Sequence, residues 1–228
     1  MTAADIGGRL TELALERRRE RSSAADVAAA VLRDLILEGA LPPGSRVSEE
    51  AFIGPLEVSR NTLREAFRLL THERLLVHKL NRGVFVRRLD AADVKDLFQV
   101  RRLIECSALL SAGKAGVPTL SAAVEVGERA AAAGRWVDVG TANLRFHQAI
   151  AGLVGSRRID ELMHQVAAEL RLGFHEMGDP KAFHESYLTR NRGIVHTLAA
   201  GDAMRAESQL RAYLNDAEYE MLDIIGRR

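Results

Sequence analysis

Four polar residues that could contact nucleic acid lie close together in the segment SRNTLREAFRLL: Arg60, Asn61, Thr62 and Arg64. The apolar residues of this segment recur at helical spacing on the opposite side: Leu63, Ala66, Phe67 and Leu70. The pattern predicts a short amphipathic helix, capped by Ser59, with a basic polar face directed outward. Guanidinium and amide groups at the start of an exposed helix can reach phosphates and base edges in a major groove. A row of arginines alone is more often a solvated surface, so these residues indicate nucleic-acid binding only together with the surrounding sequence.

A second set of polar residues lies on apolar stripes in the second half of the chain. Its members belong to four predicted helices: Arg101, Asn143, His147, Asn191 and Tyr213. Each alone is more often a hydrogen-bonded core residue, and Arg101 can pair with Glu105 four residues later. Their convergence predicts a polar cavity inside a helical bundle that can hold a small molecule. Arg101 favours an anion such as a carboxylate, although pairing with Glu105 would neutralise it.

Length and composition limit the kinds of protein to which these two sets of residues can belong. A chain of 228 residues is long enough for two domains, and a 47% hydrophobic content with five prolines fits a mostly helical globular protein. The single cysteine, Cys106, excludes an internal disulfide framework and fits a reducing cytoplasm. No apolar run is long enough to span a bilayer, and charges interrupt the first twenty residues. We therefore expect a cytoplasmic protein with no signal peptide and no membrane anchor.

The net charge of +1 conceals an asymmetry along the chain. Residues 1–88 contain 15 Lys+Arg and 12 Asp+Glu, a balance of +3, which leaves 17 and 19, a balance of −2, for the rest. Residues 60–88 contain eight basic and two acidic residues. Such a local excess of positive charge is expected where phosphates are bound.

The elements around the first set predict a winged helix-turn-helix domain over residues 23–88. A helix runs from Ser23 to Gly39, and Ser48 caps a second helix that Gly54-Pro55 should shorten. The Ser59 helix follows after a short turn. Two β-prone runs, residues 75–77 and 84–86, then form a hairpin, with Gly83 able to take positive φ at its tip. Residues 1–22 are predicted to be a tail.

This region resembles the DNA-binding domain of GntR-family bacterial transcription regulators. The resemblance rests on PPG, RVSEEAF, VSRNTLREAF and the wing sequence GVFV, which match the family pattern over residues 24–88. It implies that Arg60 and Arg64 contact bases and phosphates, that Asn61 and Thr62 face the groove, and that Arg82 and Gly83 lie at the wing tip. Glu57 departs from the pattern, because the family commonly has Gly in this turn.

Residues 89–228 contain six helical patterns and no strand signal, which predicts an all-α bundle. The segments DLFQVRRLIE, NLRFHQAI and NRGIVHTLAAGD resemble the FCD effector domain of the FadR-like branch of the same family. The fold class expected for the whole chain is therefore mostly α, with an N-terminal winged helix followed by a helical bundle. The resemblance implies that this bundle binds an effector and forms the dimer.

The same resemblance implies a metal site, which this chain departs from. Many FCD domains hold a metal with the Asp and His of D-x-x-F-H, a His opening H-R-x-I and a His in the last helix. Here only His147 remains, because Asn143, Asn191 and Tyr213 stand at the other positions. These residues supply no carboxylate or second imidazole, so we expect no metal and no cofactor, and an effector bound by direct hydrogen bonds.

The function expected from these patterns is a ligand-responsive transcription regulator. It would be a repressor that binds double-stranded palindromic operator DNA as a homodimer and responds to a small metabolite. Two alternatives remain open. One is an architectural DNA-binding protein whose helical domain only dimerises. The other is a helical-bundle enzyme using His147 and Glu105, although no nucleophile, metal set or phosphate loop accompanies them, and we expect no enzyme.

Overall fold

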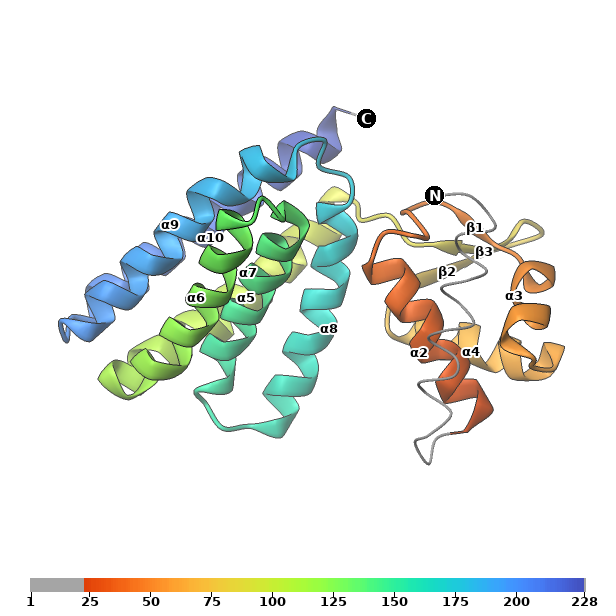
Figure 1. The fold of residues 1–228 in the computed structure, drawn as a ribbon, viewed down its shortest axis with the longest axis horizontal. Helices are drawn as coiled ribbons and strands as arrows, with labels where there is room; N and C mark the ends of the chain where they lie inside the picture. The colour runs from red at the N-terminus through yellow and green to blue at the C-terminus, as the bar shows by residue number, and fades with distance from the viewer. Residues whose placement is uncertain (1–22, 228) are drawn as a thin grey trace. The chain divides into compact units, whose positions relative to one another are not determined.

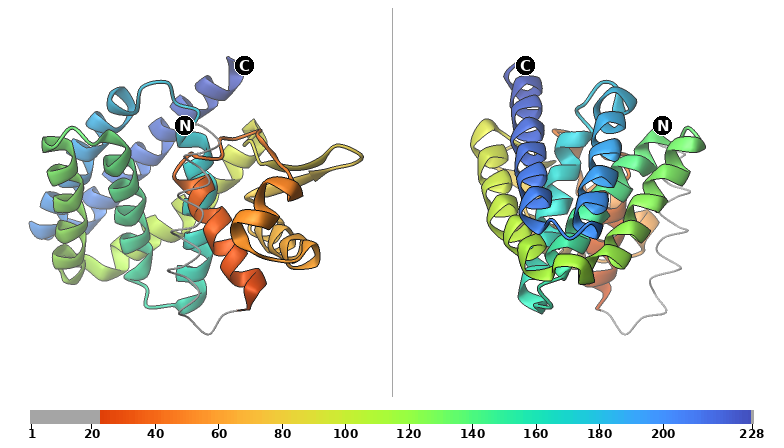
Figure 2. Two further views of the ribbon diagram at one scale, coloured as in Figure 1. Left: turned by 45° about the vertical axis from the view of Figure 1, so that its right-hand side comes forward. Right: turned by 90° about the vertical axis from the view of Figure 1, so that its left-hand side faces the viewer.

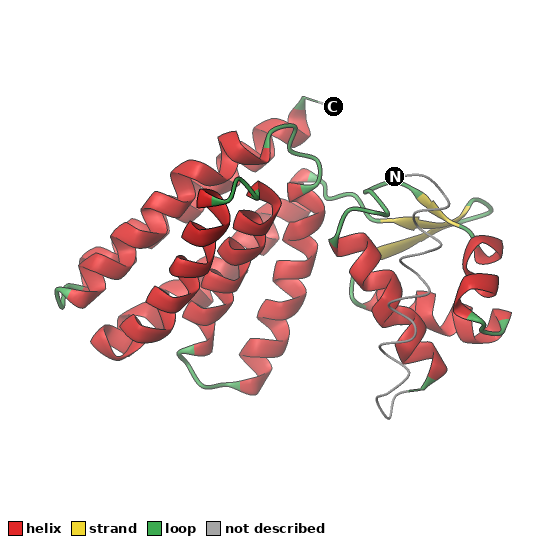
Figure 3. Ribbon diagram, in the orientation of Figure 1, coloured by secondary structure: helices red, strands yellow, loops and turns green. Residues whose placement is uncertain are grey.

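The computed structural model describes residues 23–227, and the predicted 1–22 tail lies outside that range. The chain divides into two compact units, one ending at Arg88 and the other beginning at Leu89 (Figure 1). The first unit combines helices with a small sheet, and the second is built of helices and connecting loops (Figure 3). The expected fold class, mostly α with an N-terminal winged helix, is confirmed. Among the described residues, none of the helices has the length and apolar character needed to cross a lipid bilayer.

Over residues 23–88, the described part of the first unit contains three helices and three strands. These are α2 (Ala24–Leu37), β1 (Arg46–Val47), α3 (Glu49–Leu56), α4 (Arg60–His72), β2 (Leu76–Lys79) and β3 (Gly83–Val86). The sheet is antiparallel in the order β1-β3-β2, and β2 pairs with β3 from Leu76↔Val86 to Lys79↔Gly83. Leu32 and Leu35 of α2 and Leu63 and Leu70 of α4 are fully buried. Their contact buries one face of α4 and leaves its other face for solvent or a ligand.

Local sequence signals explain most of these boundaries. Ser23 and Asp26 form a capping box at the start of α2, and Gly39 ends it with φ 82°. The second helix is short, as predicted, with Gly54 and Pro55 inside its last turn and Leu56 as its last residue. Ser48 occupies the N-cap position of α3 but makes no capping hydrogen bond through its side chain, contrary to expectation.

The predicted hairpin is present with shifted ends. Leu75 precedes β2, which continues to Lys79. The third strand, β1, was not predicted, because two residues are too short to show an alternating pattern. Backbone hydrogen bonds continue this edge, from Val86 N–H to Ser45 O and from Gly44 N–H to Val86 O, both at 2.9 Å.

Over residues 89–227, the second unit contains six α-helices and one turn of 3₁₀ helix. They are α5 (Ala91–Ala112), η1 (Gly113–Gly116), α6 (Val117–Ala132), α7 (Trp136–Gly152), α8 (Arg157–Phe174), α9 (Pro180–Ala199) and α10 (Ala203–Gly226). The views in Figure 2 show these helices side by side, with α5 packed along α10 and α6 along α7. The long interior faces of α5, α7, α9 and α10 bring the second set of polar residues into one bundle core.

Candidate DNA-binding and effector-binding sites

The N-terminus of α4 presents the predicted DNA-contacting residues. Ser59 caps the helix by accepting a hydrogen bond from the Thr62 N–H at 3.1 Å. Arg60, Asn61 and Arg64 are exposed, whereas Thr62 is half-buried and its hydroxyl lies 2.7 Å from that of Ser59. Arg60 and Asn61 are therefore available to a groove, Arg64 is exposed but paired with Glu49, and Thr62 helps to fix the helix start.

The turn before α4 explains the unusual Glu57. Glu57 has φ 52° and ψ 41°, which is the left-handed conformation that glycine adopts most easily. The Glu57 N–H donates to Gly54 O at 3.1 Å, and the Val58 N–H donates to Ile53 O at 3.3 Å. These bonds end α3 and turn the chain into α4. The turn thus has the backbone conformation that glycine favours, although the residue at this position is a glutamate.

The wing carries basic side chains around its tip. Asn81 and Gly83 both have positive φ, at 56° and 101°, and Arg82 between them is exposed. Arg46 of β1 also reaches this tip, because its Nε lies 3.4 Å from the position that a Cβ on Gly83 would occupy. Sequence reasoning missed Arg46, although it opens the quoted RVSEEAF segment.

The interior of the helical unit holds a chain of charged and polar groups. Arg101 Nε donates to Glu105 Oε1 at 2.7 Å, and His147 Nδ1 lies 2.6 Å from Glu105 Oε2. All three residues are at most 3% exposed. Burial alone would raise the pKa of Glu105, but Arg101 and His147 together lower it. Burial and the charge of Arg101 lower the pKa of His147. Glu105 is therefore ionised and His147 neutral, so Nδ1–H donates to Glu105 and Nε2 keeps its lone pair.

The other three predicted residues form a second hydrogen-bonded group. Asn191 Nδ2 donates to Asn143 Oδ1 at 2.7 Å, and the Tyr213 hydroxyl donates to the same oxygen at 2.9 Å. The ring of His147 packs against Tyr213 with centroids 4.9 Å apart, which joins the two groups. The five side chains predicted to converge do lie together, from α5, α7, α9 and α10.

A small, partly open pocket adjoins this cluster. It has a volume of about 10 Å³, enough for roughly one water molecule. Its lining comes from α5, α7 and α8: Arg101, Leu144, His147, Gln148, Met163, Val166, Ala167 and Leu170. Two buried polar atoms of the lining residues, Arg101 Nη2 and His147 Nε2, have no hydrogen-bond partner, nor does Asn191 Oδ1 in the second group. The contribution of α8 to this lining could not be predicted from the sequence, because Met163 and Val166 have the residue types and spacing of ordinary core residues.

A separate buried histidine lies between α7, α8 and α9. His184 is 3% exposed and packs edge-on against the rings of Phe174 and Phe183, with centroids 5.0 Å away. Burial, and then the charge of Arg171, lower its pKa to about 4. Its Nδ1 has no hydrogen-bond partner. His184 belongs to a different part of the core from the Glu105–His147 pair.

Family models match both units. The model of the FCD domain matches residues 96–216, which is more than half of the chain, and the model of the bacterial regulatory proteins of the gntR family matches residues 24–86. The chain belongs to the GntR family, with an FCD domain. It is thus a ligand-responsive DNA-binding transcription regulator, and the FadR-like branch expected from the sequence fits this architecture. This is a class of proteins that are generally not enzymes.

Similar proteins support the assignment over most of the chain. A solved structure described as a GntR transcriptional regulator from Rhodococcus sp. RHA1 is 43% identical, covers 89% of this chain and 99% of that chain, and has a TM-score of 0.83. The Uxu operon transcriptional regulator of Escherichia coli is 24% identical over 85% of each chain. The Nta operon transcriptional regulator of Aminobacter aminovorans is 42% identical over 67 residues, 29% of this chain and 32% of that protein.

The residues at the FCD metal positions do not fit a divalent metal in this GntR-family chain. The Asn143 oxygen already accepts two hydrogen bonds, from Asn191 and Tyr213. Burial raises the pKa of the Tyr213 hydroxyl, which makes its deprotonation by a metal still harder. Within residues 23–227, no group of three or more His, Cys, Asp or Glu side chains is arranged to hold a metal ion.

Proposed function

We propose that this GntR-family chain is a dimeric repressor whose operator affinity is controlled by a small anionic metabolite bound beside Arg101 and His147. The observation that supports the proposal is the pair of unpartnered buried atoms of residues that line the small pocket, Arg101 Nη2 and His147 Nε2. Buried polar groups without a partner are costly, so a ligand or water that satisfies both is favoured. The repressor acts in the cytoplasm, because its operator is there.

The two atoms define the chemistry of the effector. Arg101 Nη2 offers a hydrogen-bond donor next to a positive charge and suits a carboxylate or similar anion. His147 Nε2 offers an acceptor, because Nδ1–H is committed to Glu105, and suits a hydroxyl or N–H of the ligand. A compact carboxylate with a neighbouring hydroxyl or N–H matches both. Since the cavity holds about one water molecule, such an effector must enlarge it on binding, and this displacement supplies the conformational response.

The effector test compares Arg101→Met with wild type in a thermal-shift panel of small carboxylates, hydroxy acids and their amides. We expect a hydroxy acid or amino-type acid to raise the melting temperature of wild type, and Arg101→Met to remove the shift. Val137→Ala, an exposed site on α7, is the control. No shift from any compound would favour an architectural protein with an inert helical domain. Chemical turnover of a compound by the protein without DNA would favour the enzyme alternative.

The DNA part of the proposal assigns base reading to Arg60 and phosphate contact to Arg64. An operator can be selected from random duplexes with the purified protein. Arg60→Ala should cost about 1–3 kcal/mol of operator binding and relax the preference at one base pair in each half-site. The matched control is Arg129→Ala on α6, whose side chain is 68% exposed. Equal operator affinity and equal base preference for Arg60→Ala and wild type would contradict the assignment.

A further inference from the structure

The exposed face of α5 carries no charged residue along most of its length. Between residues 97 and 112, the exposed positions are Gln99, Leu103, Ser107, Leu110 and Ser111. They cover about 18 Å of helix at 1.5 Å per residue. Leu103 is 68% exposed and Leu110 is 45% exposed. An outer helix face normally carries charged residues, so a neutral stripe with two exposed leucines requires an explanation.

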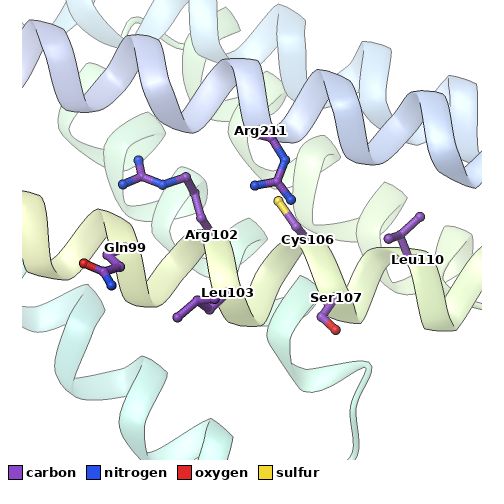
Figure 4. A pocket seen from close by; sticks show the side chains of 7 residues that line it. All are labelled: Gln99, Arg102, Leu103, Cys106, Ser107, Leu110 and Arg211. Atoms are coloured by element: carbon purple, nitrogen blue, oxygen red, sulfur yellow. The ribbon is translucent and has the colours of Figure 1, made fainter.

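A groove runs along this stripe between α5 and α10. It has a volume of about 330 Å³ and is lined by the residues that Figure 4 labels: Gln99, Arg102, Leu103, Cys106, Ser107, Leu110 and Arg211. The two guanidinium groups in it are already paired, Arg102 with Glu218 and Arg211 with Glu207. The groove therefore offers little net positive charge to an anionic small molecule, and its exposed wall consists mainly of side-chain stems.

We propose that this face of α5, with the α5/α10 groove, is the surface through which two copies of the chain pair antiparallel. The inference rests on the dimer proposed above and names its surface. An interface around a two-fold axis must contain both the projecting groups and the space that receives them on one patch. The stripe meets that condition, because the leucines project beside the groove that can receive the leucines of a second copy.

Size and charge select the antiparallel arrangement. A two-fold axis between residues 103 and 107 places Leu103 opposite Ser107 of the second copy, a large residue against a small one. Asp96 is exposed on the same face of α5, one residue before the stripe begins. Lys114 is exposed just beyond the C-terminal end of α5. Antiparallel pairing brings the Asp96 carboxylate of one copy toward the Lys114 ammonium of the other, whereas parallel pairing would bring like charges together.

The test measures self-association of the full chain by sedimentation equilibrium. Leu103→Glu and Leu110→Glu should each raise the dimer dissociation constant by about 30-fold or more, the effect expected at the centre of an interface. Val137→Glu, at a site on α7 that is 53% exposed, is the control for adding a charge to an exposed apolar position and should leave the constant unchanged. Thermal melts establish that each variant remains folded.

Cross-linking tests the register independently of stability. A mixture of the Leu103→Cys chain with the Ser107→Cys chain should form a mixed disulfide-linked dimer on oxidation more readily than either chain alone. The native Cys106 should not interfere, since it is 2% exposed and burial raises its pKa to about 12. Unchanged dimerisation in both Glu variants, or no preference for the mixed dimer, would contradict the proposal that this face of α5 forms the dimer.

Two further outcomes separate this surface from the proposed function. A wild-type chain that is monomeric at all concentrations yet binds operator DNA would overturn the surface while the regulator assignment stands. A wild-type dimer that Leu103→Glu dissociates, but that shows no sequence-selective DNA binding, would support the surface and contradict the repressor.

Discussion

Arg64 of α4 and Glu49 of α3 form an ion pair across the helix-turn-helix, with Arg64 Nε 2.7 Å from Glu49 Oε1. The two side chains are 63% and 29% exposed, so the pair contributes little to stability. Its role is positional, because it fixes a guanidinium that would otherwise sample many rotamers. A DNA phosphate must compete with Glu49 for the same donors.

We expect Glu49→Gln to increase the affinity for DNA of any sequence, because it frees Arg64 and removes a negative charge from the DNA-facing side. Arg64→Ala should weaken binding broadly and lower the slope of log K against log salt by about 1. Fluorescence anisotropy titrations at several salt concentrations measure both effects. A salt slope that is the same in Arg64→Ala and Arg129→Ala would argue against a phosphate contact.

Replacing Glu57 by glycine should stabilise the first unit by about 0.5–1 kcal/mol. The left-handed conformation costs an L-residue roughly 1–2 kcal/mol, and the greater freedom of glycine in the unfolded chain cancels part of the gain. Glu57→Ala is the control, since it removes the carboxylate but keeps the strain. Urea denaturation of the full chain should separate the two variants, and equal midpoints would contradict the strain argument.

The buried pair Arg101–Glu105 should show strong coupling in a double-mutant cycle. Arg101→Met leaves the buried Glu105 carboxylate with His147 alone, and Glu105→Leu leaves the buried Arg101 guanidinium without its partner, so each should cost about 3–5 kcal/mol of unfolding free energy. The double variant should cost less than either single change, because only the Nδ1–H of His147 then loses its acceptor. Additive losses in urea denaturation would show that the pair is not coupled.

Stability should fall as the pH is lowered from about 6.5 toward 4, partly because of His184. The unfolded chain binds a proton at His184 near its ordinary pKa of about 6.5, whereas the folded chain does so only near a pKa of about 4. Acid therefore favours the unfolded state in this window, by at most about 1.4 kcal/mol per pH unit for this histidine. His184→Leu should reduce the slope of unfolding free energy against pH. His147, whose pKa is also lowered, should supply much of the slope that remains.

Purified protein should carry no stoichiometric divalent metal, and chelators should leave its melting temperature and DNA affinity unchanged. The donors at the FCD metal positions are one imidazole, two amides and a phenol with a raised pKa. The triple change Asn143→Asp, Asn191→His and Tyr213→His should create affinity for Zn²⁺ or Ni²⁺, measured by calorimetry. Elemental analysis that finds about one metal per wild-type chain, lost in His147→Ala, would contradict the prediction.

Much of the first unit could be predicted from its sequence because its signals are local. Ser23 and Ser59 cap helices, Gly39 and Gly83 adopt positive φ, and the apolar stripe of α4 is buried as its spacing implies. The two-residue strand β1 could not be predicted, since its pairing with β3 depends on residues almost forty positions away. The exact end of α3 at Leu56 depends on the backbone bonds around Glu57, which lie beyond what the propensities of Gly54 and Pro55 can show.

The residues of the candidate effector site could be predicted from the sequence, but the hydrogen bonds between them could not. Periodicity places Arg101, Asn143 and His147 on interior helix faces, which the structure bears out by burial. Periodicity cannot show that Glu105 joins Arg101 to His147, or that Asn143 accepts two hydrogen bonds, because these contacts link different helices. The volume of a cavity likewise depends on how side chains from α5, α7 and α8 fit together, which no single segment encodes.

The wall that α8 contributes to the small cavity is made of Met163, Val166, Ala167 and Leu170, all apolar. Apolar contact has no preferred direction, so it resists sliding far less than the hydrogen bonds joining α7 to α9 and α10 through Asn143 do. The side of the bundle formed by α8 is therefore easier to displace than the side where Asn143 joins α7 to α9 and α10. A swelling ligand should push this wall of α8 outward while the Asn143 cross-link stays in place, and the backbone amides of α8 should be the first in the core to exchange with deuterium.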